Sequence, residues 1–363
     1  MTDGPGPSTG MSRRTGGWLV ALFVGVALAA LLSLIHLPYA ILKPGPVTNT
    51  LGEVSANKPL IQVSDARTYP TSGVLDFTTV AVYGGPQHPV NVWDVLAGLV
   101  DHSAHVVPEE TMFPKGTTSK EVEQENTAEM ADSQQEAIAV ALRATGATVP
   151  EVISIAQVSS GSPSKGVLRA GDEVVSVDGV PAKSTEAVRD AVQKHGPGET
   201  VAVTVRREGA TRQLKARTAD AEGRTVLGVL LRTRFDFPVK VSINAGDVGG
   251  PSAGMMFSLA IFDKLTPGAL TGGAKIAGTG TIAGDGAVGP IGGIQQKLYG
   301  ARNGGARWFL APASNCNEVV GHVPDGLKVV RVSTFAEARS AVEAIAASKG
   351  DALPPCTAVA AAG

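Results

Sequence analysis

The segment Gly249-Gly250-Pro251-Ser252-Ala253-Gly254 sets one serine in a turn of glycine and proline, directly before the apolar run Met255–Phe262. Further along, Gly289-Pro290-Ile291-Gly292-Gly293-Ile294-Gln295-Gln296-Lys297-Leu298 sets a lysine shortly after a glycine pair, and between the two lies Ala277-Gly278-Thr279-Gly280-Thr281-Ile282. Glycines let another backbone approach closely, and Pro251 suits the first position of a helix. This stretch predicts two helices, one introduced by Ser252 and one that carries Lys297 near its start.

A serine and a lysine in these surroundings indicate nucleophilic catalysis. A serine hydroxyl needs a neighbouring base to remove its proton. Lysine can be that base only if its pKa falls from about 10.4 to near 7, which corresponds to about 4 kcal/mol and is supplied mainly by burial. We expect Ile291, Ile294 and Leu298 to furnish the apolar surroundings of Lys297, and the positive end of its helix favours the neutral amine. Free N–H groups at the helix start beside Ser252 are candidates for binding an oxyanion.

In order and spacing, these residues resemble the proteolytic domain of the Lon family of Ser-Lys peptidases, over about one third of the chain (residues 223–350). The resemblance implies that Ser252 is the nucleophile, that Lys297 is the general base, and that Thr279 positions the lysine. It implies an α/β proteolytic fold without a metal or cofactor, and assembly into a homo-oligomer.

Two positions depart from the family pattern. The family usually has an aspartate where this chain has Gly249, and the nearest one here is Asp247. The family commonly has an acidic residue where this chain has Thr281. Both differences concern how the serine and the lysine are positioned.

Two other functions fit part of the pattern. Residues 250–254 also match the G-x-S-x-G turn of α/β-hydrolases, which would require His322 as base and Asp285 or Asp325 as acid. That hypothesis leaves the lysine motif unexplained. The second alternative is a membrane-tethered peptide-binding scaffold whose Lon-like domain is inactive, as the missing aspartate would allow.

Length favours a multi-domain protein, and the resemblance to the Lon family implies that it is of the α/β class. A chain of 363 residues is long enough for two or three domains. The formal net charge of −2 gives no sign of nucleic-acid binding. Cys316 and Cys356 can form a disulfide outside the cytoplasm or remain two free thiols, and the sequence leaves both open.

The N-terminal part predicts a membrane anchor. Residues 1–17 read as a cytoplasmic tail, and residues 18–38 contain no charged side chain and are long enough for a transmembrane helix. Arg13 and Arg14 before this segment favour an N-terminus inside the cell. The alternative is a cleaved signal peptide. Either way, the remaining chain is expected outside the cytoplasm.

Residues 43–145 form a mixed region to which we assign no chemistry. Leu60–Val63 and Val74–Val82 have the composition of strands, and helical patterns occur around Val92–Val100 and over Glu121–Leu142. His88, His102 and His105 do not have the spacing of a zinc site, so we expect no metal there.

Residues 146–218 resemble a PDZ domain. The pattern predicts a strand at Val152–Val158, a helix capped by Ser184, and a strand at Val201–Val205. The run Leu168–Gly179 matches the Leu-x-x-Gly-Asp…Asp-Gly sequence of that family. The resemblance implies capture of an extended peptide by strand addition. No Gly-Leu-Gly-Phe-like carboxylate loop is evident, so a closed groove is the alternative.

Beyond the PDZ-like segment, residues 220–224 read as a polar linker, and β-rich runs at Val226–Leu231 and Val239–Ile243 lead to the serine turn. Residues 351–363 read as a flexible tail. No G-x-x-x-x-G-K-[ST] phosphate loop occurs. The sequence therefore predicts a membrane-anchored, ATP-independent serine endopeptidase. We expect it to act on unfolded or flexible protein segments, with the PDZ-like domain selecting or gating them.

Overall fold

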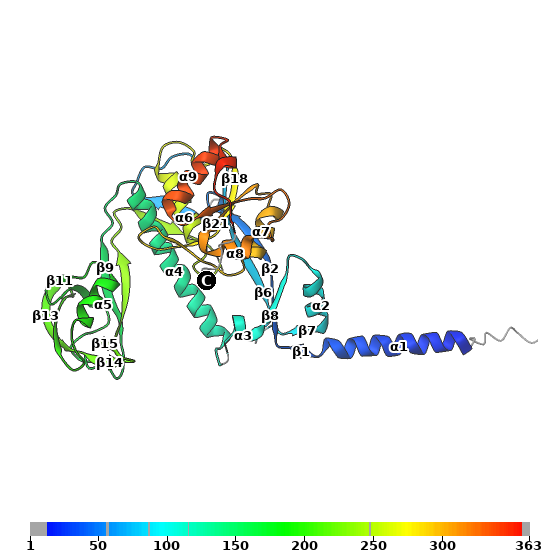
Figure 1. The fold of residues 1–363 in the computed structure, drawn as a ribbon, viewed down its shortest axis with the longest axis horizontal. Coiled ribbons are helices and arrows are strands. Elements are labelled where there is room, and N and C mark those ends of the chain that lie inside the picture. The colour runs from blue at the N-terminus through cyan, green and yellow to red at the C-terminus, as the bar shows by residue number, and fades with distance from the viewer. Residues whose placement is uncertain (1–12, 56–57, 86–87, 115, 247, 358–363) are drawn as a thin grey trace, which may run out of the picture.

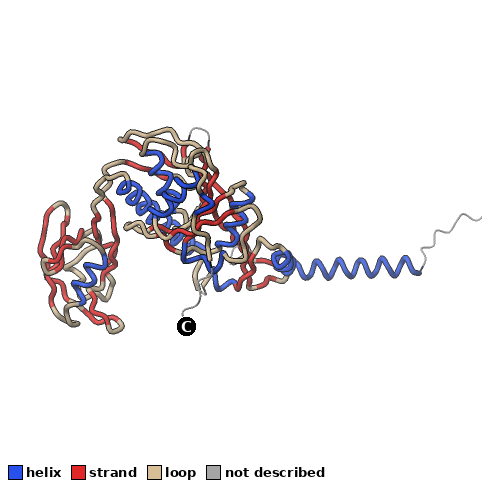
Figure 2. The backbone as a smooth tube through the Cα atoms, turned by 45° about the horizontal axis from the view of Figure 1, so that its top comes forward, coloured by secondary structure: helices blue, strands red, loops and turns tan. Residues whose placement is uncertain are grey.

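The computed structural model describes residues 13–55, 58–85, 88–114, 116–246 and 248–357. Its described residues form two bodies and one projecting helix, as Figure 1 shows. The larger body comprises residues 36–145 and 237–357, and the smaller body residues 151–235. Figure 2, turned from the first view, shows the same separation, with helix α1 extending away from both bodies.

The larger body is built on a sheet with the strand order β22-β21-β18-β6-β2-β8. The strands β22, β21, β18 and β6 run parallel, whereas β2 lies antiparallel to both β6 and β8. Their bounds are β2 Tyr39–Asn49, β6 Val74–Tyr83, β8 His105–Pro108, β18 Lys275–Gly278, β21 Trp308–Pro312 and β22 Lys328–Val332.

Helices cover both faces of this sheet, because successive strand residues point to opposite sides. On one face, α4 (Ser119–Ala144), α6 (Gly254–Leu265) and α9 (Phe335–Ala346) share one core cluster with Ile276 and Leu310. On the other face, α7 (Ile294–Asn303) and α8 (Cys316–Val319) pack on Ala277 and Phe309. The helix α6 is buried on nearly all sides, as a sequence that is apolar over most of its length predicts.

The sheet joins two parts of the chain that the sequence analysis separated. Strands β2, β6 and β8 come from the mixed region 43–145, while β18, β21 and β22 come from the segment 223–350. The division into these two units is therefore wrong, since β6 pairs directly with β18. The sequence pattern could not reveal this, because strand partners so distant in sequence leave no local signal.

The smaller body is a sheet with the strand order β13-β12-β10-β9-β16, covered by α5. Its elements are β9 Glu151–Val158, β10 Glu173–Val177, β11 Val180–Pro181, α5 Thr185–Gln193, β12 Thr200–Arg207, β13 Ala210–Arg217 and β16 Val229–Phe235. Ser184 caps α5 through its side chain, as predicted. Val201, Val203 and Val205 form one buried face of β12.

This body extends further than the predicted limit at residue 218. The expected linker at residues 220–224 is a hairpin of β14 (Ala219–Ala221) and β15 (Arg224–Val226). Strand β16 then pairs along β9 as an edge strand of the smaller sheet. The β-rich run after residue 226 therefore belongs to this body and not to the larger one.

The N-terminal helix α1 spans Arg13–Ser33 and stops before the predicted end at residue 38. Residues His36–Leu37 form β1, which pairs with β7 (Val90–Asn91), and Pro38 cannot continue a helix of hydrogen-bonded turns. In the part of the chain that the structure describes, no helix combines the length and hydrophobicity needed to cross a membrane. The predicted transmembrane helix at 18–38 is not supported.

The remaining elements are short. They are α2 Val92–Val100, α3 Glu109–Met112, β3 Glu53–Ser55, β4 Lys58–Pro59, β5 Ile61–Ser64, β17 Lys240–Ile243, β19 Thr281–Ile282, β20 Val288–Gly289, and the 3-10 turns η1 Ala313–Asn315 and η2 Gly350–Ala352. The helix α2 confirms the pattern at Val92–Val100.

The C-terminal segment is fixed to the larger body over its described part. Cys356 forms a disulfide with Cys316, and the Arg331 N–H donates to the Pro354 carbonyl oxygen at 3.0 Å. The prediction of a flexible tail from residue 351 is therefore wrong up to residue 357. The rest of that tail lies outside the described residues. Of the predicted tail at 1–17, residues 1–12 also lie outside them, whereas residues 13–17 belong to α1 and are wrongly assigned to a tail.

Candidate active site

Ser252 lies in a tight turn that precedes α6. Gly250 has φ of +79°, a conformation that glycine adopts readily, and the helix begins at Gly254. The prediction that Pro251 is the first residue of the helix is therefore wrong, because the helix begins at Gly254. Hydrogen bonds hold this turn: the Gly280 N–H donates to the Ser252 carbonyl oxygen at 2.8 Å.

Lys297 lies in the first turn of α7. This turn is at the end of the sheet where β6 extends past the last residue of β18. The helix begins after Gly293, whose φ is +67°. A Cβ at Gly293 would lie 2.7 Å from the Val80 side chain, so only glycine lets the helix start so close to β6. Ile294 and Leu298 are fully buried between α7 and the sheet, and Ile291 packs against the same cluster. These apolar residues seat the helix that carries the lysine.

The structure brings the three predicted site residues together. Lys297 Nζ lies 2.7 Å from Ser252 Oγ and 3.0 Å from Thr279 Oγ1. The Thr279 hydroxyl donates its only proton to the Ser252 carbonyl oxygen at 3.0 Å. Towards Lys297 it is therefore an acceptor, so that an amine N–H points at Thr279. The lone pair of a neutral Lys297 then remains available to Ser252.

Burial makes Lys297 a base at neutral pH. Its side chain is only 3 % exposed. This burial lowers the pKa of the Lys297 amine from 10.5 to about 7, because removal from water disfavours the charged form. A substantial fraction of the amine is then neutral at pH 7, as proton abstraction from serine requires.

Two backbone N–H groups beside the Ser252 hydroxyl have no acceptor among the described residues. They belong to Ser252 and Ala253, whereas the neighbouring Gly250 and Gly254 N–H groups are both bonded. Paired N–H groups of this kind can bind the oxygen of a tetrahedral intermediate. They match the expected oxyanion donors around Ser252.

A cleft of about 620 Å³ opens on these residues. Its walls are the end of β6, the serine turn, the start of α7 and the helix α4, which contributes Asn126 and Glu129. Apart from Lys297, Glu129 is the only ionisable side chain among the lining residues. The sequence analysis missed the contribution of α4, because nothing in a helix more than a hundred residues before Ser252 indicates that it packs beside the serine turn.

The missing aspartate at position 249 has a steric reason. A Cβ at Gly249 would lie 2.8 Å from the Asn126 Cβ, so α4 leaves no space for a side chain there. The other departure, Thr281, lies in β19, where it pairs with Gly289. Asp247, the nearest acidic residue in sequence, lies outside the described residues.

The alternative triad of an α/β-hydrolase does not form. His322 is exposed in the loop after α8, and its Nδ1 contacts the Val320 carbonyl oxygen. The Asp285 side chain accepts the Ala287 N–H. The partner of Ser252 Oγ is Lys297, so the histidine hypothesis is wrong for this arrangement.

The smaller body has a groove of about 460 Å³ between α5 and the start of β16. The segment Leu227-Gly228-Val229 forms its end, and Gly228 has φ of +65°. The Ser159 N–H and the Ser162 hydroxyl bond to the carbonyl oxygens of Gly228 and Leu227. The N–H groups of Leu227 and Gly228 have no acceptor among the described residues. Two successive free N–H groups of this kind can bind a carboxylate.

This loop is the feature that the sequence analysis did not find. The search for a carboxylate loop was confined to residues 146–218, whereas Leu227-Gly228-Val229 follows the β14–β15 hairpin. A search beyond the predicted domain end would have found the apolar-Gly-apolar pattern.

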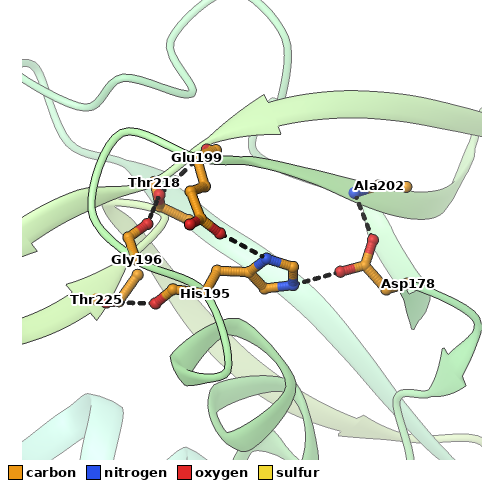
Figure 3. Close-up of polar contacts among 7 residues, drawn as sticks. All are labelled: Asp178, His195, Gly196, Glu199, Ala202, Thr218 and Thr225. Carbon is orange, nitrogen blue, oxygen red and sulfur yellow. Dashed lines mark hydrogen bonds and ion pairs between the residues drawn. The ribbon is translucent and has the colours of Figure 1, made fainter.

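Polar contacts fix the end of α5 beside this groove (Figure 3). The His195 ring lies between Asp178 and Glu199, with Nε2 2.6 Å from the first carboxylate and Nδ1 3.3 Å from the second. The Thr225 hydroxyl donates to the His195 carbonyl oxygen at 2.8 Å. Because Thr225 belongs to β15, these contacts hold α5 against the hairpin that leads into the groove loop.

Comparisons with known families agree with this arrangement. Residues 231–344 match the Lon protease (S16) C-terminal proteolytic domain, and residues 124–218 match the PDZ domain. The fold and the site thus define a chain that combines a PDZ domain, the smaller body, with a Lon-type proteolytic domain, the larger one. The limits of both matches differ from those of the domains in the structure. The PDZ match includes much of α4, which packs in the larger body, and the Lon match includes much of β16, which belongs to the smaller body.

Among curated proteins, Lon protease 2 of Bacillus subtilis is 30 % identical over 114 residues, which is 31 % of this chain and 20 % of that protein. The Lon protease of Lachnoclostridium phytofermentans is 33 % identical over 105 residues, 28 % of this chain and 13 % of that protein. The chain thus spans a fifth or less of these relatives' length. Among solved structures, the PDZ domain of the SdrC-like protein of Listeria monocytogenes is 25 % identical, covers 22 % of this chain and 85 % of that one, and has a TM-score of 0.21.

Proposed function

We propose that this protein is an ATP-independent serine endopeptidase that uses Ser252 and Lys297 to hydrolyse peptide bonds in unfolded or flexible protein segments. The observation that carries the proposal is the buried Lys297 amine, with a pKa of about 7, at 2.7 Å from the Ser252 hydroxyl. The match to a Lon-type proteolytic domain supports the same reaction class.

In the proposed reaction, neutral Lys297 takes the Ser252 proton while Oγ bonds to the substrate carbonyl carbon. The carbonyl oxygen becomes an oxyanion, held by the N–H groups of Ser252 and Ala253. Lys297 then protonates the leaving amine, the C–N bond breaks, and an acyl-enzyme remains. A water molecule then gives a proton to Lys297 while its oxygen bonds to the acyl carbon. The bond from that carbon to Ser252 Oγ breaks, Lys297 returns the proton to Oγ, and the acyl group leaves as a carboxylic acid. Thr279 keeps the lysine oriented throughout.

The substrate is proposed to bind as an added strand. Strand β18 pairs with β6 over Val74–Phe77 only, whereas β6 continues to Tyr83. On that side residues 79–83 have no neighbouring strand among the described residues. Thr79, Val80 and Val82 also line the cleft that contains Ser252. An extended peptide segment could form backbone hydrogen bonds with this edge of β6. A folded protein could not enter the cleft without local unfolding.

The PDZ domain is proposed to bind the C-terminus of a protein chain. The free N–H groups of Leu227 and Gly228 would hold the terminal carboxylate, and the edge strand β16 would accept the peptide backbone beside α5. Such binding would select substrates or gate their access to the cleft.

ATP independence rests on the absence of a phosphate-binding loop from the sequence. A location outside the cytoplasm is supported by the Cys316–Cys356 disulfide, since such bonds persist in oxidising compartments. Attachment to the cell membrane through residues 18–38 stays a prediction, tested by carbonate extraction of membranes and by protease accessibility in intact cells. Assembly into a homo-oligomer also stays a prediction, and sedimentation of the purified protein tests it.

The test of the proposed function is degradation of a loosely folded protein by the purified full chain, with and without ATP. We expect cleavage without ATP, no stimulation by ATP, and no cleavage by Ser252→Ala or Lys297→Ala. His322→Ala is the control and should retain full activity. An inert wild type with no labelling of Ser252 by a fluorophosphonate would favour the inactive peptide-binding scaffold instead.

A further inference from the structure

Ser133 is a buried hydroxyl on α4 that bonds to the turn of the proposed nucleophile. Its Oγ donates to the Pro251 carbonyl oxygen at 2.9 Å, across 118 positions of the sequence, and the residue is only 5 % exposed. A serine inside a helix commonly bonds back to the carbonyl four residues earlier, as Ser258 does to Gly254. Ser133 makes no such local bond and reaches a different segment instead.

The bond to Pro251 fixes one peptide plane. No cis peptide bond occurs among the described residues, so the Pro251 carbonyl and the Ser252 N–H belong to one trans plane and point in opposite directions. When Ser133 holds the carbonyl, the Ser252 N–H is directed away from α4. This N–H is one of the two free donors next to the nucleophile.

The adjoining peptide plane is held by residues of a different segment. The Ser252 carbonyl oxygen accepts hydrogen bonds from the Gly280 N–H at 2.8 Å and from the Thr279 hydroxyl at 3.0 Å. The Ala253 N–H is trans to that carbonyl and is fixed in the same manner. A second bond from α4, in which the Asn126 carbonyl oxygen accepts the Gly250 N–H at 3.0 Å, keeps the turn against this helix.

From this geometry we infer that Ser133 is a positioning residue for the oxyanion hole. By holding the Pro251 carbonyl, it aims the Ser252 N–H at the oxygen of the tetrahedral intermediate. Preorganised donors stabilise a transition state because they need not reorient as charge develops. Ser133 would therefore act on the chemical step and leave ground-state substrate binding unaffected. The inference rests on the proposed peptidase function.

The experiment compares Ser133→Ala with Ser258→Ala in the full chain. Both variants delete a buried hydroxyl bonded to a backbone carbonyl, but Ser258 does not contact the peptide planes beside the nucleophile. For a fluorogenic peptide we expect Ser133→Ala to lower kcat by about 10- to 100-fold, somewhat less than the loss of a whole oxyanion donor, with KM within about twofold. Ser258→Ala should keep the wild-type kcat.

A second readout separates positioning from general destabilisation. A peptide aldehyde forms a tetrahedral adduct with the serine, so its affinity should fall by the same factor as kcat, while that of the cleaved peptide product should not change. Ser133→Cys keeps the side-chain shape with a weaker donor and should give a smaller loss in the same direction.

Three results would overturn the inference: an unchanged kcat in Ser133→Ala, an equal loss in Ser258→Ala, or an aldehyde affinity that does not follow kcat. If the wild type cleaves the peptide and Ser133→Ala matches it, only the role of Ser133 fails. A wild type that neither cleaves the peptide nor binds the aldehyde overturns the peptidase function and this inference together.

Discussion

Lys297 shows how one buried charge-bearing group sets the chemistry of a site. Its amine is removed from water by the close packing of α7, β6 and the serine turn. This burial is the cause of its lowered pKa. Thr279 passes its only proton to the Ser252 carbonyl and thereby orients the amine. The two hydroxyl groups around Lys297 thus have different roles, one as the proposed proton donor and one as an acceptor.

The first prediction concerns pH. Because Lys297 must be neutral to act and its pKa is about 7, kcat/KM should rise about tenfold per pH unit below 7 and level off above it. Initial rates on a peptide without ionisable side chains, measured from pH 5 to 9, check this. A rate that does not depend on pH, or that falls as pH rises through 7, would contradict a lysine base.

The second prediction is that Lys297→Met abolishes activity but stabilises the fold at neutral pH. A pKa of about 7 in the folded state against 10.5 in the unfolded state corresponds to about 5 kcal/mol of destabilisation at and below pH 7. Loss of the two hydrogen bonds from the amine offsets about 2 kcal/mol, which leaves a net gain of about 3 kcal/mol.

The sign of this effect depends on pH. Between pH 7 and 10.5 the unfolded chain binds the proton and the folded chain does not, so wild-type stability rises with pH across that window. The advantage of Lys297→Met should shrink as pH rises and disappear at about pH 9, where the remaining penalty equals the loss of the two hydrogen bonds. Denaturant unfolding at pH 7 and pH 10 measures it, with Lys240→Met, an exposed lysine, as the control. An equal difference at both pH values would be inconsistent with a buried neutral amine.

At the scale of elements, α4 has two functions along its length. Its part up to Ser133 lines the cleft and bonds to the serine turn through the Asn126 carbonyl oxygen and the Ser133 hydroxyl. Its second half is buried in the core of the larger body, where Ala137–Leu142 pack against α6. The same helix therefore builds the domain and shapes the site.

The third prediction follows from the contact between α4 and Gly249. Restoring the family's acidic residue by Gly249→Asp should lower activity and cost about 1–3 kcal/mol of stability, because the new Cβ would lie 2.8 Å from the Asn126 Cβ. Thermal unfolding and peptide cleavage measure both effects. Gly161→Asp, at a turn glycine with no atom near the new Cβ, is the matched control. Improved activity of Gly249→Asp would show that α4 can move to accept the side chain. Steric exclusion by α4 would then not explain why the aspartate is missing.

On the scale of the whole molecule, Arg143 lies where the two domains are joined. At the end of α4 its guanidinium donates to the carbonyl oxygens of Gly284, in the larger body, and Val149, before β9. It also forms an ion pair with Glu151 and lies over the Phe235 ring at the end of β16. Both connections between the PDZ and Lon-type domains thus meet at one side chain, which belongs to α4, the helix that also bonds to the serine turn.

The fourth prediction concerns the C-terminal segment. The Cys316–Cys356 disulfide closes a loop of 40 positions, so a chain-entropy estimate gives about 4 kcal/mol of stabilisation. The double variant Cys316→Ala/Cys356→Ala should unfold at lower denaturant concentration than the oxidised wild type. Reductant should lower the wild-type midpoint and leave the variant unchanged. Coinciding midpoints would mean that the segment is held by packing alone.

The sequence by itself indicated the proposed chemistry, because Ser252, Thr279 and Lys297 lie in short motifs that can be found along the chain without knowledge of its fold. It also determined most single elements, such as the helix at Val92–Val100 and the cap at Ser184, because hydrophobic periodicity and capping act over a few residues. It did not predict the extent of α1, the sheet that β16 joins or the ordered C-terminal segment, since these depend on partners elsewhere in the chain.

Only the tertiary structure decided that β6 completes the sheet of the Lon-type domain and that α4 supplies a wall of the cleft. It also decided that Asn126 excludes a side chain at position 249 and that Ser133 bonds to the serine turn. Contacts between residues a hundred or more positions apart are selected by how whole elements pack, and no short stretch of sequence encodes them. The depressed pKa of Lys297 is of this kind, because burial is a property of the folded chain and not of the lysine motif.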